Sequence, residues 1–284
     1  MLNKIAYLGI PGSFSHTAAI KYFPTNSSFI GTETFRDIFD MIEVGKAKYG
    51  AIPIENSLAG SVYENYDLLD NYKLYIVGEH YIKIEHYLLV PGRNNKTRVD
   101  LKQIKKVYSH QKALEQCGSF FKAHPWIDKI TYSDTANAAR FVSHKSDPAI
   151  AAIASKAAAQ LYSLAIVEKN IEDEPYNYTH FLVIAKNQED NATVNKCSLS
   201  VQIPHKPGSL VKTLGILKHH KCNLMKIESR PLRRELLKGN PFEYIFYFDF
   251  DYDPKKHDIH KILEDMRRNV TKVKLLGLYK ESHT

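Results

Sequence analysis

Cysteines and long apolar runs are scarce in this sequence. Its three cysteines, Cys117, Cys197 and Cys222, are odd in number and widely spaced, which argues against a disulfide framework and against a cysteine zinc site. No apolar run approaches the roughly 18–20 residues of a membrane-spanning helix. Met1 leads straight into a strand-like segment at Ile5, without a basic and apolar leader. We therefore expect a reducing, cytoplasmic setting and no membrane partner.

Motifs for metals and nucleotides are also missing. The sequence has neither a glycine-rich phosphate loop ending in Lys-Ser/Thr nor an HExxH motif. Its 13 histidines are scattered, and the adjacent pair His219-His220 is more typical of a surface than of a ligand set. We therefore expect neither a metal nor a cofactor.

The net charge of +8 lies in the C-terminal third. Residues 191–284 hold 18 Lys and Arg against 10 Asp and Glu, whereas residues 1–190 hold 21 of each sign. A basic region of this kind is compatible with nucleic-acid binding. It lacks, however, the glycine-flanked aromatic signature of an RNA-recognition sheet. We favour a solvated basic surface and expect no nucleic-acid partner.

The first 186 residues alternate strand-like and helical patterns. Strand-like segments are residues 5–9, 50–53, 73–77, 81–90, 106–108, 130–132, 149–153, 164–167 and 181–185. Helical spacing is found at residues 15–22, 35–45, 62–69, 111–122, 135–144 and 155–162. Such alternation predicts parallel or mixed sheets covered on both faces. Two such sheets with crossing connections would leave a cleft between two lobes.

The pattern changes after a polar stretch at residues 187–195, which predicts a linker. Strands are then expected at residues 197–203, 223–230, 243–250 and 273–279, and helices at residues 207–218 and 257–268. The order βαββαβ is that of the ferredoxin-like split motif. Because such a sheet leaves an edge and a face open, pairing between two copies is a natural outcome.

Polar clusters stand where predicted strands end and helices begin. They are residues 11–16, 53–61, 109–111, 134–136 and Ser155. The carboxyl ends of strands line the crevice of open α/β sheets, and helix N-termini favour anions, so these turns could converge on a multiply charged small molecule. For any single turn, ordinary helix capping is the simpler interpretation. The segment Glu55-Asn56-Ser57 is the exception, because Ser61 would already supply the cap there.

Taken in order, several short stretches resemble the prephenate dehydratase family. They are residues 7–9, 12–16, 51–62, 109–111 with 113–114, 134–136 with 138–139, 151–155 and 178–181. Residues 206–210, and 223–224 with 226–231, are similar to the family's regulatory ACT domain. Each stretch is weak alone, but together, at this spacing, they are a specific signal that covers nearly the whole chain.

The resemblance implies a mixed α/β and α+β protein with two domains. A two-lobed catalytic domain of the type II periplasmic-binding-protein class is expected at residues 1–187. Its lobes would be about residues 1–77 with 165–187, and residues 78–164. A linker at residues 188–195 and a ferredoxin-like ACT domain at residues 196–284 would follow.

The resemblance also implies an activity. The family converts prephenate to phenylpyruvate, water and carbon dioxide on the route to phenylalanine, which inhibits the enzyme. Formation of an aromatic ring drives the reaction, so no cofactor is required. Because the catalytic pattern begins at Ile5, we expect a monofunctional enzyme without a chorismate mutase domain. A homodimer or homotetramer through the ACT domains is expected.

Thr179 matches the threonine of the family's Thr-Arg-Phe motif, which donates or hydrogen-bonds to the leaving hydroxyl. A neutral threonine is a weak acid, so the proton source stays open. From residue chemistry alone, Thr179 would be a β-branched residue opening a strand. His180 replaces the family's arginine. Since neighbours in a strand face opposite sides, we expect His180 to point away from the cleft and to have a modest effect on turnover.

The resemblance extends to binding residues. Those expected at the substrate are Ser13, Phe14, Ser15, Glu55, Asn56, Ser57, Ser61, His110, Gln111, Thr135, Ala136, Ser155 and Phe181. Those expected at phenylalanine are Pro207, Gly208, Ser209, Leu210, Asn223, Leu224, Glu228 and Ser229. Gly208 would let the chain turn tightly into a helix whose N-terminus can meet an amino-acid carboxylate. A simple dimerisation module is the alternative for this domain.

Other functions remain open from the sequence. Arogenate differs from prephenate in carrying an amine, and no single residue excludes it as the substrate. The two-lobed pattern also allows a sensor that binds a small ligand without chemistry, although Thr179 and Glu55-Asn56-Ser57 argue against it. A nucleic-acid regulator would require salt-sensitive DNA binding by the basic third.

Overall fold

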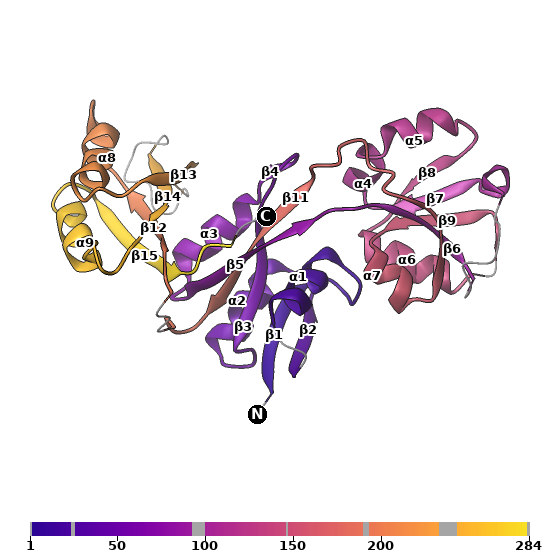
Figure 1. Cartoon of the computed structure of the whole chain (residues 1–284), viewed down its shortest axis with the longest axis horizontal. Coiled ribbons are helices and arrows are strands. Elements are labelled where there is room, and N and C mark those ends of the chain that lie inside the picture. Colours follow the sequence, from indigo (N-terminus) through magenta and orange to yellow (C-terminus); the bar gives the residue numbers. More distant parts are fainter. Residues whose placement is uncertain are drawn as a thin grey trace.

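Three β-sheets lie along the long axis of the molecule (Figure 1). The computed structural model describes residues 2–23, 26–92, 100–145, 147–189, 193–232 and 243–282. A six-stranded sheet occupies the middle, a five-stranded sheet one end, and a four-stranded sheet built from the last third of the chain the other end. None of the helices in these ranges is both long and apolar enough to cross a membrane.

The middle sheet has the strand order β2-β1-β3-β11-β5, with β4 paired to β3. Its strands are β1 (Asn3–Leu8), β2 (Ser27–Thr32), β3 (Tyr49–Asn56), β4 (Gly60–Ser61), β5 (Tyr75–Lys83) and β11 (Tyr178–Ala185). Helices α1 (Phe14–Tyr22), α2 (Phe35–Glu43) and α3 (Tyr63–Asn71) cover it. Alternation along β1 places Ile5 against Ala19 of α1 and Ala6 against Ile38 of α2, so the helices cover opposite faces.

The five-stranded sheet has the order β10-β6-β9-β7-β8. Its strands are β6 (Tyr87–Pro91), β7 (Lys106–Ser109), β8 (Asp128–Thr131), β9 (Ile150–Ala154) and β10 (Leu164–Lys169). Around it lie α4 (Gln111–Glu115), α5 (Gly118–Ala123), α6 (Thr135–Ser143), α7 (Lys156–Leu161) and a 3₁₀ turn, η1 (Leu101–Gln103). The central strand β9 is apolar and buried throughout, as expected for a strand covered on both faces.

The last sheet is antiparallel, with the order β13-β14-β12-β15. Its strands are β12 (Lys196–Gln202), β13 (Leu224–Pro231), β14 (Tyr244–Asp251) and β15 (Lys272–Tyr279), and its helices are α8 (Ser209–His219) and α9 (Ile259–Arg267). The element order is βαββαβ, as the sequence predicts. Phe248 and Phe250 face the helices, while Tyr247 joins the core of the middle sheet.

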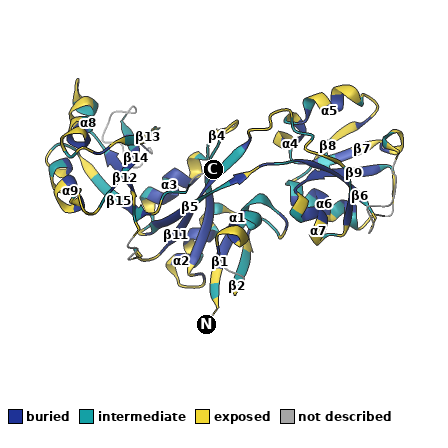
Figure 2. Cartoon of the chain, viewed as in Figure 1, coloured by how far each residue is buried: buried dark blue, intermediate teal, exposed yellow. Residues whose placement is uncertain are grey.

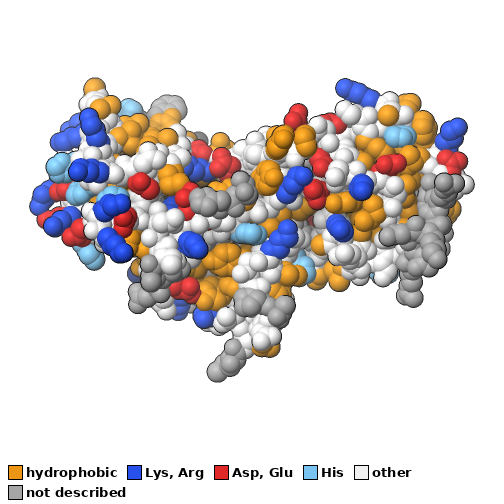
Figure 3. Space-filling model, in the orientation of Figure 1, with side chains coloured by type: hydrophobic (Ala, Val, Ile, Leu, Met, Phe, Trp, Pro, Cys, Tyr) orange, Lys and Arg blue, Asp and Glu red, His pale blue; other side chains and the backbone are white. Residues whose placement is uncertain are grey.

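Lys and Arg side chains gather over the end that carries α8 and α9, with Asp and Glu among them (Figure 3). Several are paired: Arg268 lies 2.6 Å from Glu264, and Lys256 lies 2.9 Å from Asp253. Mixed signs and local pairing favour the solvated basic surface over a uniform stripe for nucleic acid.

Several segments differ from the sequence prediction. Residues 27–32 were not expected as a strand, but form β2 beside β1. The single strand predicted over residues 81–90 is two strands, because residues 84–86 cross from the middle sheet to the five-stranded one. The helix predicted over residues 111–122 is interrupted between Glu115 and Gly118.

The division between the first two sheets also differs from the expected lobe limits. The chain crosses between them at residues 84–86 and again at 170–177, rather than near 77/78 and 164/165. Strand-like residues continue across both expected limits, since β5 spans Tyr75–Lys83 and β10 spans Leu164–Lys169. The hydrophobic pattern of the sequence therefore does not mark the residues at which the chain leaves one sheet and enters the next.

The middle and C-terminal sheets share one buried core, which includes Leu276 and Tyr247 from one side and Ile76 and Tyr66 from the other. Figure 2 shows the strands of this central region mostly buried and the outer faces of α8 and α9 exposed. Backbone approaches backbone closely here: a Cβ added at Gly277 of β15 would stand 2.1 Å from the carbonyl oxygen of Ile76 in β5.

We predict that Gly277→Ala weakens this junction, because two strands must separate to admit the methyl group. Forced packing of this kind costs about 1–3 kcal/mol of unfolding free energy, measurable by urea titration. Gly215→Ala is the matched control, since Gly215 lies in α8 with no heavy atom within 4 Å of an added Cβ. That change should stabilise by about 0.5–1 kcal/mol. Equal unfolding midpoints for the two variants would contradict the close approach.

Candidate active site

A cleft of about 980 Å³ lies between the middle sheet and the five-stranded sheet. The middle sheet contributes turns that follow β1, β2 and β3, and the other sheet contributes the starts of α4 and α6. Nine of the fourteen predicted residues line it: Ser13, Phe14, Ser15, Asn56, Ser61, His110, Thr135, Thr179 and Phe181. Strand ends far apart in the sequence thus share one hollow.

Thr179 and Asn56 are held together at the cleft wall. They are cross-strand partners on β11 and β3, and the Asn56 amide Nδ2 donates to Thr179 Oγ1 at 3.0 Å. Asn56 Oδ1 accepts from the backbone N–H groups of Leu58 and Ala59, at 3.1 and 2.8 Å, which fixes the amide. Because Thr179 Oγ1 already accepts one bond, its hydroxyl hydrogen remains available to a group in the cleft.

Glu55 and Ser57 lie outside the cleft, contrary to expectation. Glu55 precedes Asn56 on β3 and therefore faces the opposite side, where its carboxylate accepts from Lys226 of β13 at 2.5 Å. Ser57 Oγ instead fastens the loop before β11: it donates to the Tyr176 carbonyl and accepts from the Tyr178 N–H, at 3.1 and 3.0 Å.

Ser61 does not cap a helix, as the sequence argument had assumed. Helix α3 begins after Val62 without a side-chain cap. Ser61 lines the cleft and its hydroxyl donates to Glu228 of β13 at 2.5 Å. The polar residues 55–57 therefore do not cap α3. Asn56 instead closes the turn that follows β3.

Gln111, Ala136 and Ser155 also lie outside the cleft lining. Gln111 bonds Glu115 and Thr131 at the surface, at 2.7 Å each. Ala136 is completely buried in α6. Ser155 caps α7, accepting from the Ala158 N–H at 3.0 Å.

Ser155 has a second role, which is to join the two sheets. Its hydroxyl donates to the carbonyl of Gly12, in the turn after β1, at 2.8 Å, and Tyr162 OH donates to the Pro11 carbonyl at 2.6 Å. Gly12 has φ +92°, and an added Cβ would stand 3.1 Å from the Cα of Ala158. The turn therefore needs glycine both for its conformation and for this contact.

Two cations in the cleft were missed by the sequence analysis. Lys112 of α4 and Arg140 of α6 both line it from the five-stranded side. The Arg140 guanidinium donates to Asn137 Oδ1, another lining residue, at 2.9 Å. Lys112 lies between the matching stretches 109–111 and 113–114. Arg140 lies one helical turn after Ala136, and this spacing is a signal that could have found it.

His86 is a further lining residue that the sequence did not reveal. It belongs to the crossing segment 84–86 and is 1% exposed. Its Nε2 lies 2.9 Å from Gln116 Oε1, so Nε2 carries the hydrogen and the buried Nδ1 is left without a partner in the described structure. Burial lowers the pKa of His86, with the Gln116 bond opposing. It therefore offers a neutral acceptor at neutral pH.

Among the residues that the structure describes, no group of three or more His, Cys, Asp or Glu side chains is arranged to hold a metal.

A family model described as prephenate dehydratase matches residues 5–189 of this chain. The bifunctional chorismate mutase/prephenate dehydratase of Escherichia coli is 36% identical over 97% of this chain and 70% of its own length. The chain belongs to the prephenate dehydratase family.

Two solved structures superpose on nearly the whole of this chain. Prephenate dehydratase from Arthrobacter aurescens, in complex with L-Phe, superposes with a TM-score of 0.83 and 25% identity, covering 98% of this chain and 90% of that one. GqqA, described as a quorum quenching acylase, has a TM-score of 0.84 and 27% identity, covering 99% and 98%. The two-lobed, periplasmic-binding-like α/β arrangement of the first two sheets is therefore shared with prephenate dehydratases.

His180, which departs from the prephenate dehydratase Thr-Arg-Phe motif, points away from the cleft that Thr179 and Phe181 line. Its Nε2 lies 2.8 Å from Glu79, and its ring stacks on Tyr81 with centroids 4.4 Å apart. His180 thus lies on the face of β11 that strand alternation predicts. A modest effect of the substitution on turnover stays a prediction.

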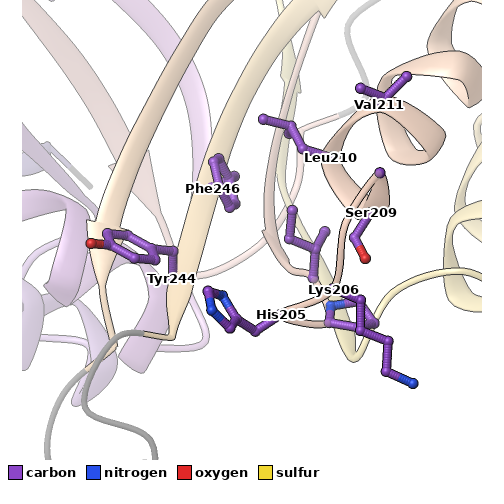
Figure 4. A pocket seen from close by; sticks show the side chains of 10 residues that line it. His205, Lys206, Ser209, Leu210, Val211, Tyr244 and Phe246 are labelled. Atoms are coloured by element: carbon purple, nitrogen blue, oxygen red, sulfur yellow. The ribbon is translucent and has the colours of Figure 1, made fainter.

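A second hollow, of about 180 Å³, lies in the C-terminal sheet between the 203–208 turn, the start of α8 and β14. Figure 4 shows Tyr244 and Phe246 on one side and Leu210 and Ser209 on the other. Of the residues predicted to bind phenylalanine, Gly208, Ser209 and Leu210 line it. Pro207, Asn223, Leu224, Glu228 and Ser229 do not; Asn223 and Leu224 line a separate hollow beside α8, and Glu228 faces Ser61.

Proposed function

We propose that this protein is a prephenate dehydratase, which converts prephenate to phenylpyruvate, water and carbon dioxide in phenylalanine biosynthesis. Membership of the family supports the reaction. The observation that carries the assignment of the site is the Thr179 hydroxyl, which is oriented by Asn56 and has its hydrogen free, in a cleft that also holds Lys112 and Arg140.

Two cations would bind the anionic groups of the substrate. Prephenate carries two carboxylates, and Lys112 and Arg140 lie on one wall, beside the start of α6 that Asp134 caps. Thr179 lies on the other, with Asn56 and Phe181. A substrate that spans the cleft would place its anionic groups toward the five-stranded sheet and its ring hydroxyl toward β11. This arrangement would fix the orientation of the substrate in the cleft. Orientation is the main requirement for a reaction that formation of the aromatic ring already drives.

Chemistry then proceeds at the hydroxyl. The C–O bond breaks, the hydroxyl leaves as water after taking a proton, and the carboxylate leaves as carbon dioxide while its bonding electrons complete the aromatic ring. A hydrogen bond from Thr179 to the leaving oxygen grows stronger as charge develops there. Threonine remains un-ionised, since its hydroxyl is too weak an acid to originate the proton.

The direct test uses the purified full chain with prephenate and follows phenylpyruvate absorbance against an enzyme-free control. Turnover well above the control is expected. Arogenate is tested in parallel by phenylalanine formation. A higher kcat/KM for prephenate supports the proposal, and a higher kcat/KM for arogenate would assign the protein as an arogenate dehydratase instead. Ligand binding without product from either compound would favour a sensor.

We predict that Thr179→Val, which keeps the shape and removes the hydroxyl, lowers kcat by about 10²-fold, the usual scale for losing such assistance. The control is Thr131→Val, because Thr131 is an exposed strand residue of β8 whose hydroxyl bonds only Gln111 among the described side chains. That variant should retain wild-type kcat. Near-normal turnover by Thr179→Val would remove Thr179 from the catalytic role.

The C-terminal region extends the proposal. We propose that residues 1–187 form the catalytic domain and residues 196–284 an ACT domain, through which the protein forms a homodimer or homotetramer in the cytoplasm. The hollow at the start of α8 would bind phenylalanine, with its carboxylate at the α8 amides and its ring near Tyr244 and Phe246. A relative crystallised with L-Phe supports this ligand.

Gly208 provides a test of that site. It begins α8 with φ +81°, and no heavy atom lies within 4 Å of an added Cβ. Gly208→Val should disturb the helix start and raise the half-inhibitory phenylalanine concentration by about tenfold, equivalent to about 1.4 kcal/mol of binding free energy. Gly45→Val is the matched control: φ is +77° and its surroundings are equally open, but it follows α2. Equal inhibition of both variants would place the effector elsewhere.

The likeness to GqqA raises acyl-group hydrolysis as a second activity. An acylase needs a nucleophile activated by a base. Within the described cleft lining, however, no Ser or Thr hydroxyl is hydrogen-bonded to a His ring: Thr179 bonds Asn56, and His86 bonds Gln116. The cleft geometry therefore favours the dehydratase.

A further inference from the structure

The side of β11 that faces away from the cleft carries a buried charged network. Glu79 of β5 lies 2.8 Å from His180 Nε2. Lys196 Nζ reaches the two oxygens of the same carboxylate at 2.9 and 3.2 Å. The backbone N–H of Ser282, near the C-terminus, donates to Glu79 Oε1 at 3.0 Å. One carboxylate thus binds the catalytic strand, the C-terminal sheet and the chain end.

The three charged or polar side chains of this network are buried, so each depends on its partners in place of water. Glu79 is 2% exposed, Lys196 4% and His180 6%. Burial alone would raise the pKa of Glu79, but the His180 hydrogen bond and the Lys196 charge outweigh it and hold that pKa below its usual value. A buried charge that loses its partner is strongly unfavourable, so Glu79 and Lys196 constrain each other's position.

Lys196 reaches Glu79 because of strand alternation. It is the first residue of β12, and on this strand Cys197 and Leu199 face α8 and α9. Lys196 and Ser200 face the middle sheet, where Ser200 Oγ donates to Asp70 at 2.7 Å. The cation that neutralises Glu79 therefore comes from the C-terminal sheet and belongs to the same junction as the shared core.

The network adjoins Thr179 at a weak point of the strand ladder. The pairing of β11 with β3 is regular at Thr179, which faces Asn56, but it shifts between His180 and Phe181, where the partner is Pro53. Proline cannot donate to a ladder, so the pairing with β3 is interrupted here. On its other edge, β11 pairs with β5 in unbroken register from Tyr178 to Val183. The side-chain contacts of His180 add to that pairing a restraint next to Thr179, on the face away from the cleft.

We propose that Lys196, Glu79 and His180 form a positioning network that holds Thr179 against Asn56, so that catalysis depends on a cation contributed by the C-terminal sheet. This inference rests on the proposed dehydratase function. None of the three residues lines the cleft, so they would act through β11 and not by touching the substrate.

The test compares kinetic constants of full-length variants with prephenate. Lys196→Met should lower kcat by about tenfold or more and leave KM within about twofold, because a displaced threonine loses a contact made mainly in the transition state. Lys196→Arg should recover most of kcat, since a guanidinium can reach the same carboxylate. Loss of kcat that Arg does not restore, or an effect on KM alone, would contradict the network.

Lys272→Met is the matched control. Lys272 lies on β15 of the same sheet and pairs with Asp70 of α3 at 3.2 Å, but its side chain is 51% exposed. Its removal should leave kcat within about twofold, since exposed ion pairs contribute little. An equal loss in both variants would show a general effect of the interface.

A double variant separates positioning from stability. In Lys196→Met, Glu79 loses its buried cation, which can weaken folding, whereas Lys196→Met/Glu79→Gln removes both charges and keeps a side chain that can bond His180 and Ser282. Circular dichroism at the assay temperature should show this variant folded, with kcat still reduced. Wild-type kcat in the folded double variant would overturn the inference. Absence of turnover in the wild-type protein would instead overturn the proposed function on which it depends.

Discussion

The pairing of β5 with β11 determines where most other features lie. The two strands are antiparallel over eight registered residue pairs, from Tyr178 with Lys83 to Ala185 with Tyr75. The segments beyond one end of this pair cross to the five-stranded sheet, and Ile84 and His86 of the first crossing line the cleft. β5 also packs against β15 of the C-terminal sheet. The cleft and the junction with the C-terminal sheet thus share this strand pair.

Because side chains alternate along a strand, the residues of β11 and β3 face either the cleft or the opposite side of the sheet. On β11, Thr179 and Phe181 face the cleft, and His180 faces buried Glu79. On β3, Asn56 faces Thr179 while Glu55 pairs with Lys226 of β13. A single peptide step therefore separates a residue that would contact substrate from one that contacts the C-terminal sheet. Coupling between the two regions needs no long path through the core.

This also explains how far the sequence could lead. Motif similarity and alternation together predicted a cleft that contains Thr179 and Asn56 and excludes His180, because both depend on local order along a strand. Glu55 was wrongly predicted at the substrate, because a motif match does not distinguish neighbours on opposite faces of a strand, and in the structure Glu55 faces away from the cleft. Lys112, Arg140 and His86 were missed because their roles depend on how two sheets face each other. Strand β2 and the crossing at residues 84–86 likewise follow from tertiary pairing.

The C-terminal sheet presents different chemistry on its two sides. On β14, Phe246 lines the hollow at the start of α8, whereas Tyr247 packs against Tyr66 and donates to its carbonyl at 2.9 Å. The residues that line the hollow therefore lie on the helix side of the sheet, and the buried Lys196–Glu79 pair lies on the side that meets the middle sheet. Under the proposed regulation, a response of the catalytic region to phenylalanine in this hollow would have to cross the sheet that separates the two.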